Sequence, residues 1–225
     1  MVTGAARGIG AAIAARLRAD GLEVVTIDRD EGCDHRIDLR SDPLPDLGDV
    51  DVCVSNAAIT DTIAPAHRMT PEQWSRDIDV NLTGALRVIQ ACLGGMRDRG
   101  YGRIVVISSG AARSGLPGQV AYAASKAGLL GMVKTIAAEN AGRGVTANAV
   151  LPGMVETEKV KAMPAEVLDA VTANLPAGRM AAPEEVAALV AFLASDEAAY
   201  VTGEEIGIAG GFGLNTLSLG RQPSR

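Results

Sequence analysis

TGAARGIG, residues 3–10, stands between a short apolar segment and an alanine-rich stretch whose apolar residues have helical spacing. Its glycines follow the order GxxxGxG, which differs from the GxGxxG of the general dinucleotide fingerprint. Glycines in such a turn let backbone N–H groups approach a pyrophosphate at a helix N-terminus, where the helix dipole favours negative charge. A tight strand-to-helix turn without a ligand is the alternative. The residues of this turn that we expect to bind the cofactor are Gly4, Arg7, Gly8, Ile9 and Gly10.

Strand-like and helix-like segments alternate along the rest of the chain, which is typical of a parallel sheet with helices on both faces. The predicted strands are short β-branched runs, and their continuous apolar character fits burial on both faces. These runs are residues 22–28, 35–39, 50–56, 103–109, 146–151 and 205–209. We therefore expect an α/β fold, a doubly wound Rossmann-type sheet in three α/β/α layers, as a single domain over residues 1–225.

The start signals of two helices are clear. Thr70 followed by Pro71 and Gln73 predicts a capping box that opens a helix reaching Arg99. A second helix is expected to open at Pro183, with apolar residues at helical spacing behind it.

The composition argues against several classes of protein. The 225 residues are 48% hydrophobic and carry a net charge of −6, whereas a nucleic-acid surface needs clustered Lys and Arg. No apolar run approaches the roughly 18 residues of a membrane span. The three cysteines are odd in number without CxxC spacing, and His35 and His67 have no ligand spacing. We expect a cytoplasmic protein with no metal, nucleic-acid or membrane partner.

Asp28 lies at the end of the second predicted strand, where an acidic side chain can accept the ribose hydroxyls of NAD. It would repel the 2′-phosphate of NADP, so NAD is favoured. The alternative is a solvated aspartate at a strand end. Arg29 and Arg7 could each pair with a 2′-phosphate, which keeps NADP open.

Tyr122 and Lys126 are four residues apart on a predicted helix and therefore share a face. An ammonium about 5 Å from a phenol, at an effective dielectric near 20, would lower the phenol pKa by about two units. The tyrosine could then exchange a proton with an alcohol or a carbonyl. Ser109 ends a predicted strand, where ligands bind in such sheets, and Ser108 competes for its place.

The ordered motifs of the chain resemble those of the short-chain dehydrogenase/reductase family, in its single-domain branch. They include TGAARGIG at 3–10, SNAAI at 55–59, DVNLTG at 79–84, ISSGAA at 107–112, YAASKAG at 122–128 and NAVLPGMVET at 148–157.

The resemblance implies roles for the matching residues. Ser109 corresponds to the serine that orients the substrate, Tyr122 to the acid/base, and Lys126 to the residue that binds the nicotinamide ribose. Asn81 matches an asparagine that holds a water in a proton relay, although alone it would be read as a core amide that kinks a helix. The other cofactor contacts implied on the adenosine side are Asp38, Leu39, Asn56, Ala57 and Ala58. Pro152 and Gly153 would border the nicotinamide, with Val155 as its carboxamide contact and Thr157 as a phosphate contact.

The chain also departs from the family pattern. Only seventeen residues separate Asp38 from Asn56, so the helix that most members have there is expected to be lost or reduced to a loop. Residues 154–176 should form a lid over the substrate. The tail 212–225 reaches beyond the last strand, to a neighbouring subunit or to its own site. Asp77 and Asp79 are interpreted as a solvated helix face, and a homo-oligomer, tetramer or dimer, is expected by resemblance.

Together these features predict an oxidoreductase that transfers a hydride between a nicotinamide cofactor, NAD favoured, and a secondary alcohol or ketone of small-molecule size. The alternatives are an NADPH-dependent ketoreductase of the 3-oxoacyl type and a non-catalytic nucleotide-binding protein on the same fold. A dehydratase or epimerase of the wider family is a further alternative, but those chains usually carry a substrate domain.

Overall fold

A computed structural model describes residues 1–214 of the chain; the part of the predicted tail at 215–225 lies outside the described residues. Seven parallel strands form one sheet in the order β3-β2-β1-β4-β5-β6-β7. The strands are β1 (Val2–Thr3), β2 (Thr26–Asp28), β3 (His35–Arg36), β4 (Val52–Ser55), β5 (Gly102–Ile107), β6 (Val145–Pro152) and β7 (Glu205–Ile208). The strand order reverses between β1 and β4, which is where ligands bind in doubly wound sheets.

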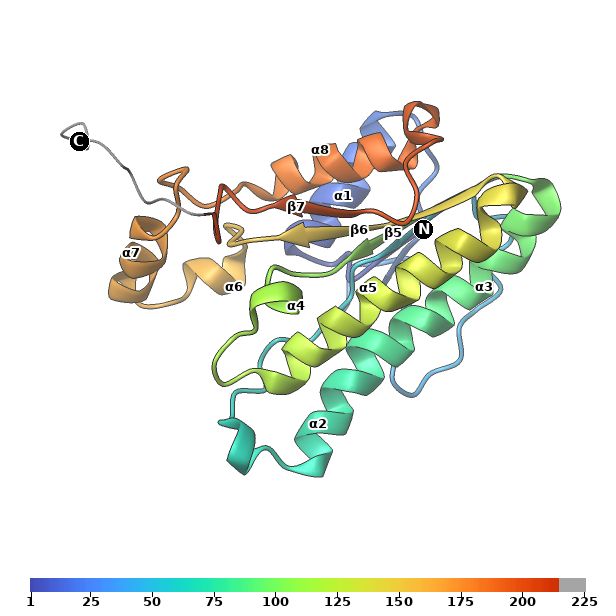
Figure 1. The fold of residues 1–225 in the computed structure, drawn as a ribbon. Coiled ribbons are helices and arrows are strands. Elements are labelled where there is room, and N and C mark those ends of the chain that lie inside the picture. Colours follow the sequence, from blue (N-terminus) through green and yellow to red (C-terminus); the bar gives the residue numbers. More distant parts are fainter. Residues whose placement is uncertain (215–225) are drawn as a thin grey trace.

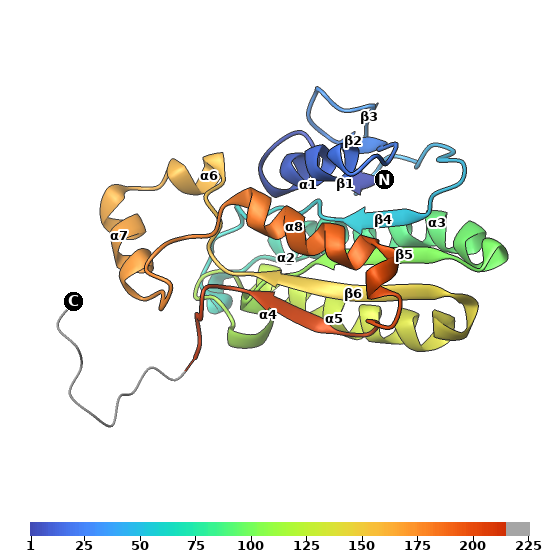
Figure 2. The ribbon, with the colours of Figure 1, turned by 90° about the horizontal axis from the view of Figure 1, so that it is seen from above.

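Helices cover both faces of the sheet, as Figures 1 and 2 show. The helices are α1 (Gly8–Ala19), α2 (Pro71–Ile78), α3 (Gly84–Arg99), α4 (Ala111–Ser114), α5 (Val120–Asn140), α6 (Glu158–Lys161), α7 (Ala165–Ala173) and α8 (Pro183–Ala194). Short 3-10 turns span η1 (Ala66–Arg68), η3 (Ala141–Arg143) and η4 (Asp196–Ala198), and a π-helical turn spans η2 (Asp79–Thr83). The predicted three-layer Rossmann-type architecture is confirmed.

Two apolar cores flank the sheet. One joins α1 and α8 to the strands through residues such as Ile13, Val54 and Val190. The other joins α3 and α5 to the opposite face through residues such as Ile89 and Val133. Every residue of β4, β5 and β6 is buried, in agreement with their continuous apolar sequences.

The predicted capping box is present at the start of α2. The Gln73 N–H donates to the Thr70 hydroxyl at 3.2 Å, and the Thr70 N–H donates to the Gln73 side chain at 3.0 Å. The helical run ends at Arg99, as expected, with Gly100 in the left-handed conformation. The difference from the prediction is the π turn in the middle of this run, which separates α2 from α3.

Two further expectations have clear outcomes. Residues 39–51, between β3 and β4, contain no helix, so the predicted loss of that element is confirmed. The interpretation of Asp77 as solvated is wrong, because its side chain is fully buried in α2, which packs against α5. Asp79 is partly exposed and lies 3.5 Å from Arg40.

Within residues 1–214, we find no helix with both the length and the apolar character needed to cross a membrane.

Candidate active site

The glycine turn between β1 and α1 is tightly built. Gly4 and Gly8 have φ values of +67° and +58°, which favour glycine. A Cβ on Gly10 would collide with the Gly4 carbonyl oxygen, and a Cβ on Gly4 would lie 2.8 Å from the Cα of Ala57. The first turn of α1 contains no acidic residue, and its N-cap Arg7 makes no side-chain capping bond within the described residues. Backbone N–H groups therefore face the carboxyl edge of the sheet, as a pyrophosphate site requires.

Asn56 holds this turn in place. Its side-chain amide donates to the carbonyls of Thr3 and Gly4 at 3.0 and 3.1 Å. The Thr3 hydroxyl in turn accepts the N–H groups of Asn56 and Ala57 at 3.0 and 3.1 Å. The side chain of Asn56 is thus directed at the turn, while Ala58 beside it is exposed.

The end of β2 carries a charged cluster. The Asp28 carboxylate accepts the N–H groups of Ala6 and Asp30, at 3.0 and 3.1 Å, so each of its oxygens already has a backbone hydrogen-bond donor. Asp30 lies 2.8 Å from Arg7 and 3.8 Å from Arg29. A polar hollow of about 450 Å³ opens beside this cluster. Its lining residues are Arg29, Asp30, Arg36, Asp38 and Asp42. The Asp38 carboxylate accepts the N–H of Arg40, and Leu39 is buried nearby.

The two candidate serines have different surroundings. Ser108 is buried, and its hydroxyl donates to the Lys126 carbonyl at 2.9 Å, so it fastens α5 to the sheet. Ser109 is only partly buried, and its hydroxyl accepts the N–H of Ala111 at 3.1 Å. The Ser109 side chain also lowers the pKa of Tyr122, so it lies beside the phenol. The geometry therefore selects Ser109 as the partner of the phenol.

Tyr122 and Lys126 lie on one face of α5, but their electrostatics differ from the prediction. Burial raises the pKa of Tyr122, and the Ser109 side chain opposes that shift. Burial also lowers the pKa of Lys126 to about 8. The Lys126 ammonium lies 5.8 Å from the centroid of the Tyr122 ring and donates to the Ile107 carbonyl at 2.7 Å. Desolvation is the largest cause of the pKa shift at both groups, so the expected lowering of the tyrosine pKa is not seen.

Asn81 occupies the π turn and faces inward. Its side chain accepts the N–H of Ile59 at 2.8 Å and donates to the Ile59 carbonyl at 3.0 Å. It also donates to the Ser125 hydroxyl at 3.2 Å, and that hydroxyl donates to the Tyr122 carbonyl at 2.7 Å. Asn81 therefore braces the first turns of α5. A π turn adds one residue to the helical repeat, which commonly marks a functional position.

The segment after β6 closes the other side of the site. Pro152 ends β6, and a Cβ on Gly153 would lie 2.9 Å from the Cα of Ala209. Val155 is buried, and Thr157 caps α6. The Cγ2 of Thr157 would lie 3.3 Å from a Cβ on Gly8, so the residue predicted to contact a phosphate lies beside the glycine turn.

Helices α6 and α7 project past the carboxyl edge of the sheet, where the sequence predicts a lid (Figures 1 and 2). Lys159 of α6 donates to the Thr60 hydroxyl across the site. The Thr60 carbonyl accepts a hydrogen bond from Gln119, just before α5, at 2.7 Å. These contacts are not predictable from the sequence, because the loop that carries Thr60 has no motif of its own.

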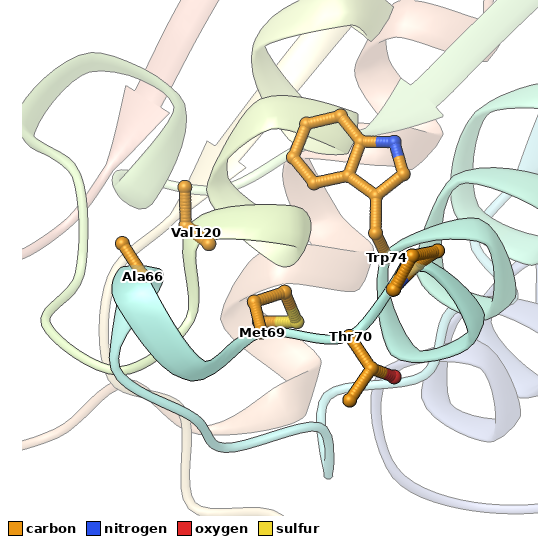
Figure 3. Close-up of a pocket in the computed structure, with 6 residues that line it drawn as sticks. Ala66, Met69, Thr70, Trp74 and Val120 are labelled. Carbon is orange, nitrogen blue, oxygen red and sulfur yellow. The ribbon is translucent and has the colours of Figure 1, made fainter.

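A second hollow, of about 320 Å³ and largely apolar, lies where η1, α2 and α5 meet. Figure 3 shows the Trp74 ring, Met69 and Val120 around it. Its remaining lining residues are Ala66, Thr70 and Pro71. Trp74 and Val120 are exposed, which makes this an apolar area of the surface.

Comparison with known proteins gives consistent matches. The family described as enoyl-(acyl carrier protein) reductase matches residues 38–213. An acetoacetyl-CoA reductase of Rhizobium meliloti (strain 1021) is 44% identical over 94% of this chain and 96% of its own. The 3-oxoacyl-(acyl-carrier-protein) reductase FabG of Vibrio cholerae is 41% identical over 94% and 95%.

Solved structures agree with these sequence matches. A crystal structure from Agrobacterium tumefaciens, assigned as a 2-deoxy-D-gluconate 3-dehydrogenase with bound NADP, has a TM-score of 0.86 and 32% identity. The match covers 94% of both chains. These matches confirm the family resemblance expected from the motifs. They also confirm the expected chemistry, which is oxidation or reduction at CH–OH or C=O groups.

Proposed function

Because the chain belongs to the short-chain dehydrogenase/reductase family, whose members act on CH–OH or C=O groups with a nicotinamide cofactor, we propose that it is an NADPH-dependent reductase of 3-oxoacyl thioesters. Acetoacetyl-CoA is the substrate to test first. The similarity to acetoacetyl-CoA reductase along nearly the whole of both chains carries this proposal. The substrate carbonyl would lie at the carboxyl ends of β5 and β6, between Ser109 and Tyr122.

Tyr122 acts as the general acid in this reaction. Its raised pKa keeps the phenol protonated at neutral pH, which is the state that can give a proton to the 3-oxo oxygen. Ser109, whose side chain lies beside the phenol, orients the same oxygen through a hydrogen bond from its hydroxyl. When bound, the reduced nicotinamide supplies the hydride to the carbonyl carbon.

Lys126 and Asn81 support the proton transfer. The Lys126 ammonium lies near the ring of Tyr122, so it stabilises the phenolate that forms once the proton has left. The same ammonium would bind the nicotinamide ribose. Asn81 keeps the first turns of α5 in register through Ser125. Once Lys126 has passed a proton toward the Tyr122 phenolate, a water held at Asn81 would return a proton to Lys126.

The charged cluster at β2 would receive the adenosine end of the cofactor. Asp28 is engaged with the backbone of Ala6 and Asp30, which supports a role as an anchor of the glycine turn. Arg7 and Arg29 are exposed and share Asp30 as their counterion, so both can turn to a 2′-phosphate. The relative with bound NADP supports this assignment. The position of Asp28 favours NAD, which remains the second candidate.

The test compares initial rates of acetoacetyl-CoA reduction with NADPH and with NADH. The absorbance of the reduced nicotinamide measures each rate. We expect a KM for NADPH at least about tenfold below that for NADH, because only NADPH carries a 2′-phosphate that can form charge-assisted hydrogen bonds with Arg7 and Arg29. Arg7→Ala and Arg29→Ala should each raise the KM for NADPH and leave that for NADH within about twofold. Arg16→Ala, in an exposed ion pair with Asp20 on α1, is the control.

Two results would change the assignment. A lower KM for NADH would support the NAD reading built on Asp28. Turnover of a sugar acid such as 2-deoxy-D-gluconate, with none of acetoacetyl-CoA, would replace the proposed substrate class.

A further inference from the structure

The loop of residues 59–62, after β4, lies between the lid and the start of α5. Lys159 and Gln119 both bind Thr60, and Asn81 binds both backbone groups of Ile59, as described above. On the outer side, Arg76 forms an exposed ion pair with Asp61 at 2.7 Å. The loop is therefore a wall of the site that touches the lid, and the cofactor contacts expected from the sequence do not include it.

Asp77 holds the far end of this loop. Its side chain has no exposed surface, and its Oδ1 accepts the Thr62 hydroxyl at 2.5 Å. Its Oδ2 has no hydrogen-bond partner within residues 1–214. A buried carboxyl with one partner is costly, and an apolar side chain at this inward position of α2 would avoid that cost. Burial also raises the pKa of Asp77, which favours the neutral acid.

We propose that Asp77 is a positioning residue for the reduction, because it holds Thr62 and so fixes the wall that meets the lid and the substrate. Asp77 and Asn81 are four residues apart along α2 and η2, and they hold the two ends of the loop at Thr62 and Ile59. This role rests on the proposed function. It concerns substrate binding and leaves the glycine turn untouched, so the two substrates of the enzyme should respond differently.

Asp77→Ala and Thr62→Val remove the same hydrogen bond from opposite sides. Each should raise the KM for acetoacetyl-CoA about tenfold and change the KM for NADPH by less than about twofold. The double variant should be no worse than Asp77→Ala alone. Asp77→Asn is nearly isosteric with the neutral acid and can still accept the Thr62 hydroxyl, so it should retain the wild-type KM. Arg76→Gln, which removes only the exposed ion pair to the same loop, is the matched control.

Hydrogen exchange followed by mass spectrometry gives a readout that does not need turnover. Compared with the wild type, Asp77→Ala and Thr62→Val should show faster exchange at residues 59–62 and the same exchange at residues 3–10. Asp77→Asn should match the wild type at both segments. Unchanged exchange at 59–62, or an equal rise in the KM of both substrates without rescue by Asp77→Asn, would overturn the role of Asp77. A wild-type enzyme inactive on acetoacetyl-CoA would count against the proposed function alone, since the exchange test still decides the positioning role.

Discussion

At the scale of single residues, Lys126 illustrates a conflict between stability and chemistry. Its ammonium is 3% exposed and has the Ile107 carbonyl as a hydrogen-bond acceptor. Burial lowers its pKa from 10.5 to about 8, which corresponds to a cost on the order of 3 kcal/mol for keeping the charge inside. The proposed roles of this residue need that charge, so the chain retains it at a cost to folding.

The pH dependence of stability tests this view. The folded pKa of Lys126 lies below the unfolded one, so between about pH 8 and about pH 10.5 the unfolded chain binds more protons. The free energy of unfolding should therefore rise with pH in that window relative to Lys126→Met, which lacks the titration. At about pH 7, Lys126→Met should be the more stable protein by up to about 3 kcal/mol, yet inactive. Denaturant unfolding at both ends of the window measures this difference, and a difference independent of pH would contradict the explanation.

The same titration should appear in catalysis. Loss of the Lys126 proton removes the charge that stabilises the phenolate, so kcat/KM for reduction should fall above about pH 8, since kcat/KM reports ionisations of the free enzyme.

At the scale of elements, the helical run from α2 to α3 separates what local sequence specifies from what it does not. Its capping box and its end at Arg99 depend on neighbouring residues, and both were predicted. The π turn at Asp79–Thr83 inserts one residue into the helical repeat, and the spacing of the apolar residues does not predict that insertion. The burial of Asp77 was missed for a related reason, because its partner Thr62 lies in a loop without periodicity.

The candidate site divides in the same way. The glycine turn and the pair on α5 could be predicted, because each is contained in one short stretch of sequence. The pKa of Tyr122 could not, since it depends on how deeply the folded molecule buries the phenol. The contact between Lys159 and Thr60 joins residues far apart in the chain, and only the folded arrangement brings them together.

The unit formed by β1, the glycine turn and α1 gives a prediction at this scale. Gly10→Ala would place a Cβ against the Gly4 carbonyl oxygen and 2.6 Å from the Asn56 amide, and neither is the end of a flexible side chain free to move away. We expect cofactor binding to be lost and the protein to be destabilised by about 2 kcal/mol or more. Gly131→Ala in α5 is the control, because its Cβ would meet nothing within 4 Å. It should be neutral or stabilising by up to about 1 kcal/mol. Cofactor titration and thermal unfolding of both variants would decide, and binding by Gly10→Ala at wild-type affinity would refute the packing argument.

At the scale of the whole molecule, the alternation of strands and helices was enough to predict the architecture, because burial on both faces leaves a parallel sheet few other arrangements. The aromatic side chains that this arrangement leaves exposed predict how copies of the molecule associate. On the α5 side, Trp74 is 40% exposed at the rim of the apolar hollow in Figure 3. On the opposite side, Phe192 of α8 is 42% exposed. Both residues belong to the described part of the chain, and the sheet lies between the helices that carry them (Figure 1).

Trp74 and Phe192 are exposed aromatic residues on opposite faces, and a dimer of dimers has two different self-complementary interfaces. Exposed aromatic residues are the usual anchors of such interfaces. We therefore expect the wild-type protein to be a tetramer by light scattering. Trp74→Glu and Phe192→Glu should each halve its mass, and the double variant should be monomeric, since a buried unpaired carboxylate opposes association at each interface. Exposed Val167, in α7 beyond the carboxyl edge of the sheet, provides Val167→Glu as the control that should leave the mass unchanged. A wild-type monomer, or a tetramer unaffected by both substitutions, would show that these surfaces serve another purpose.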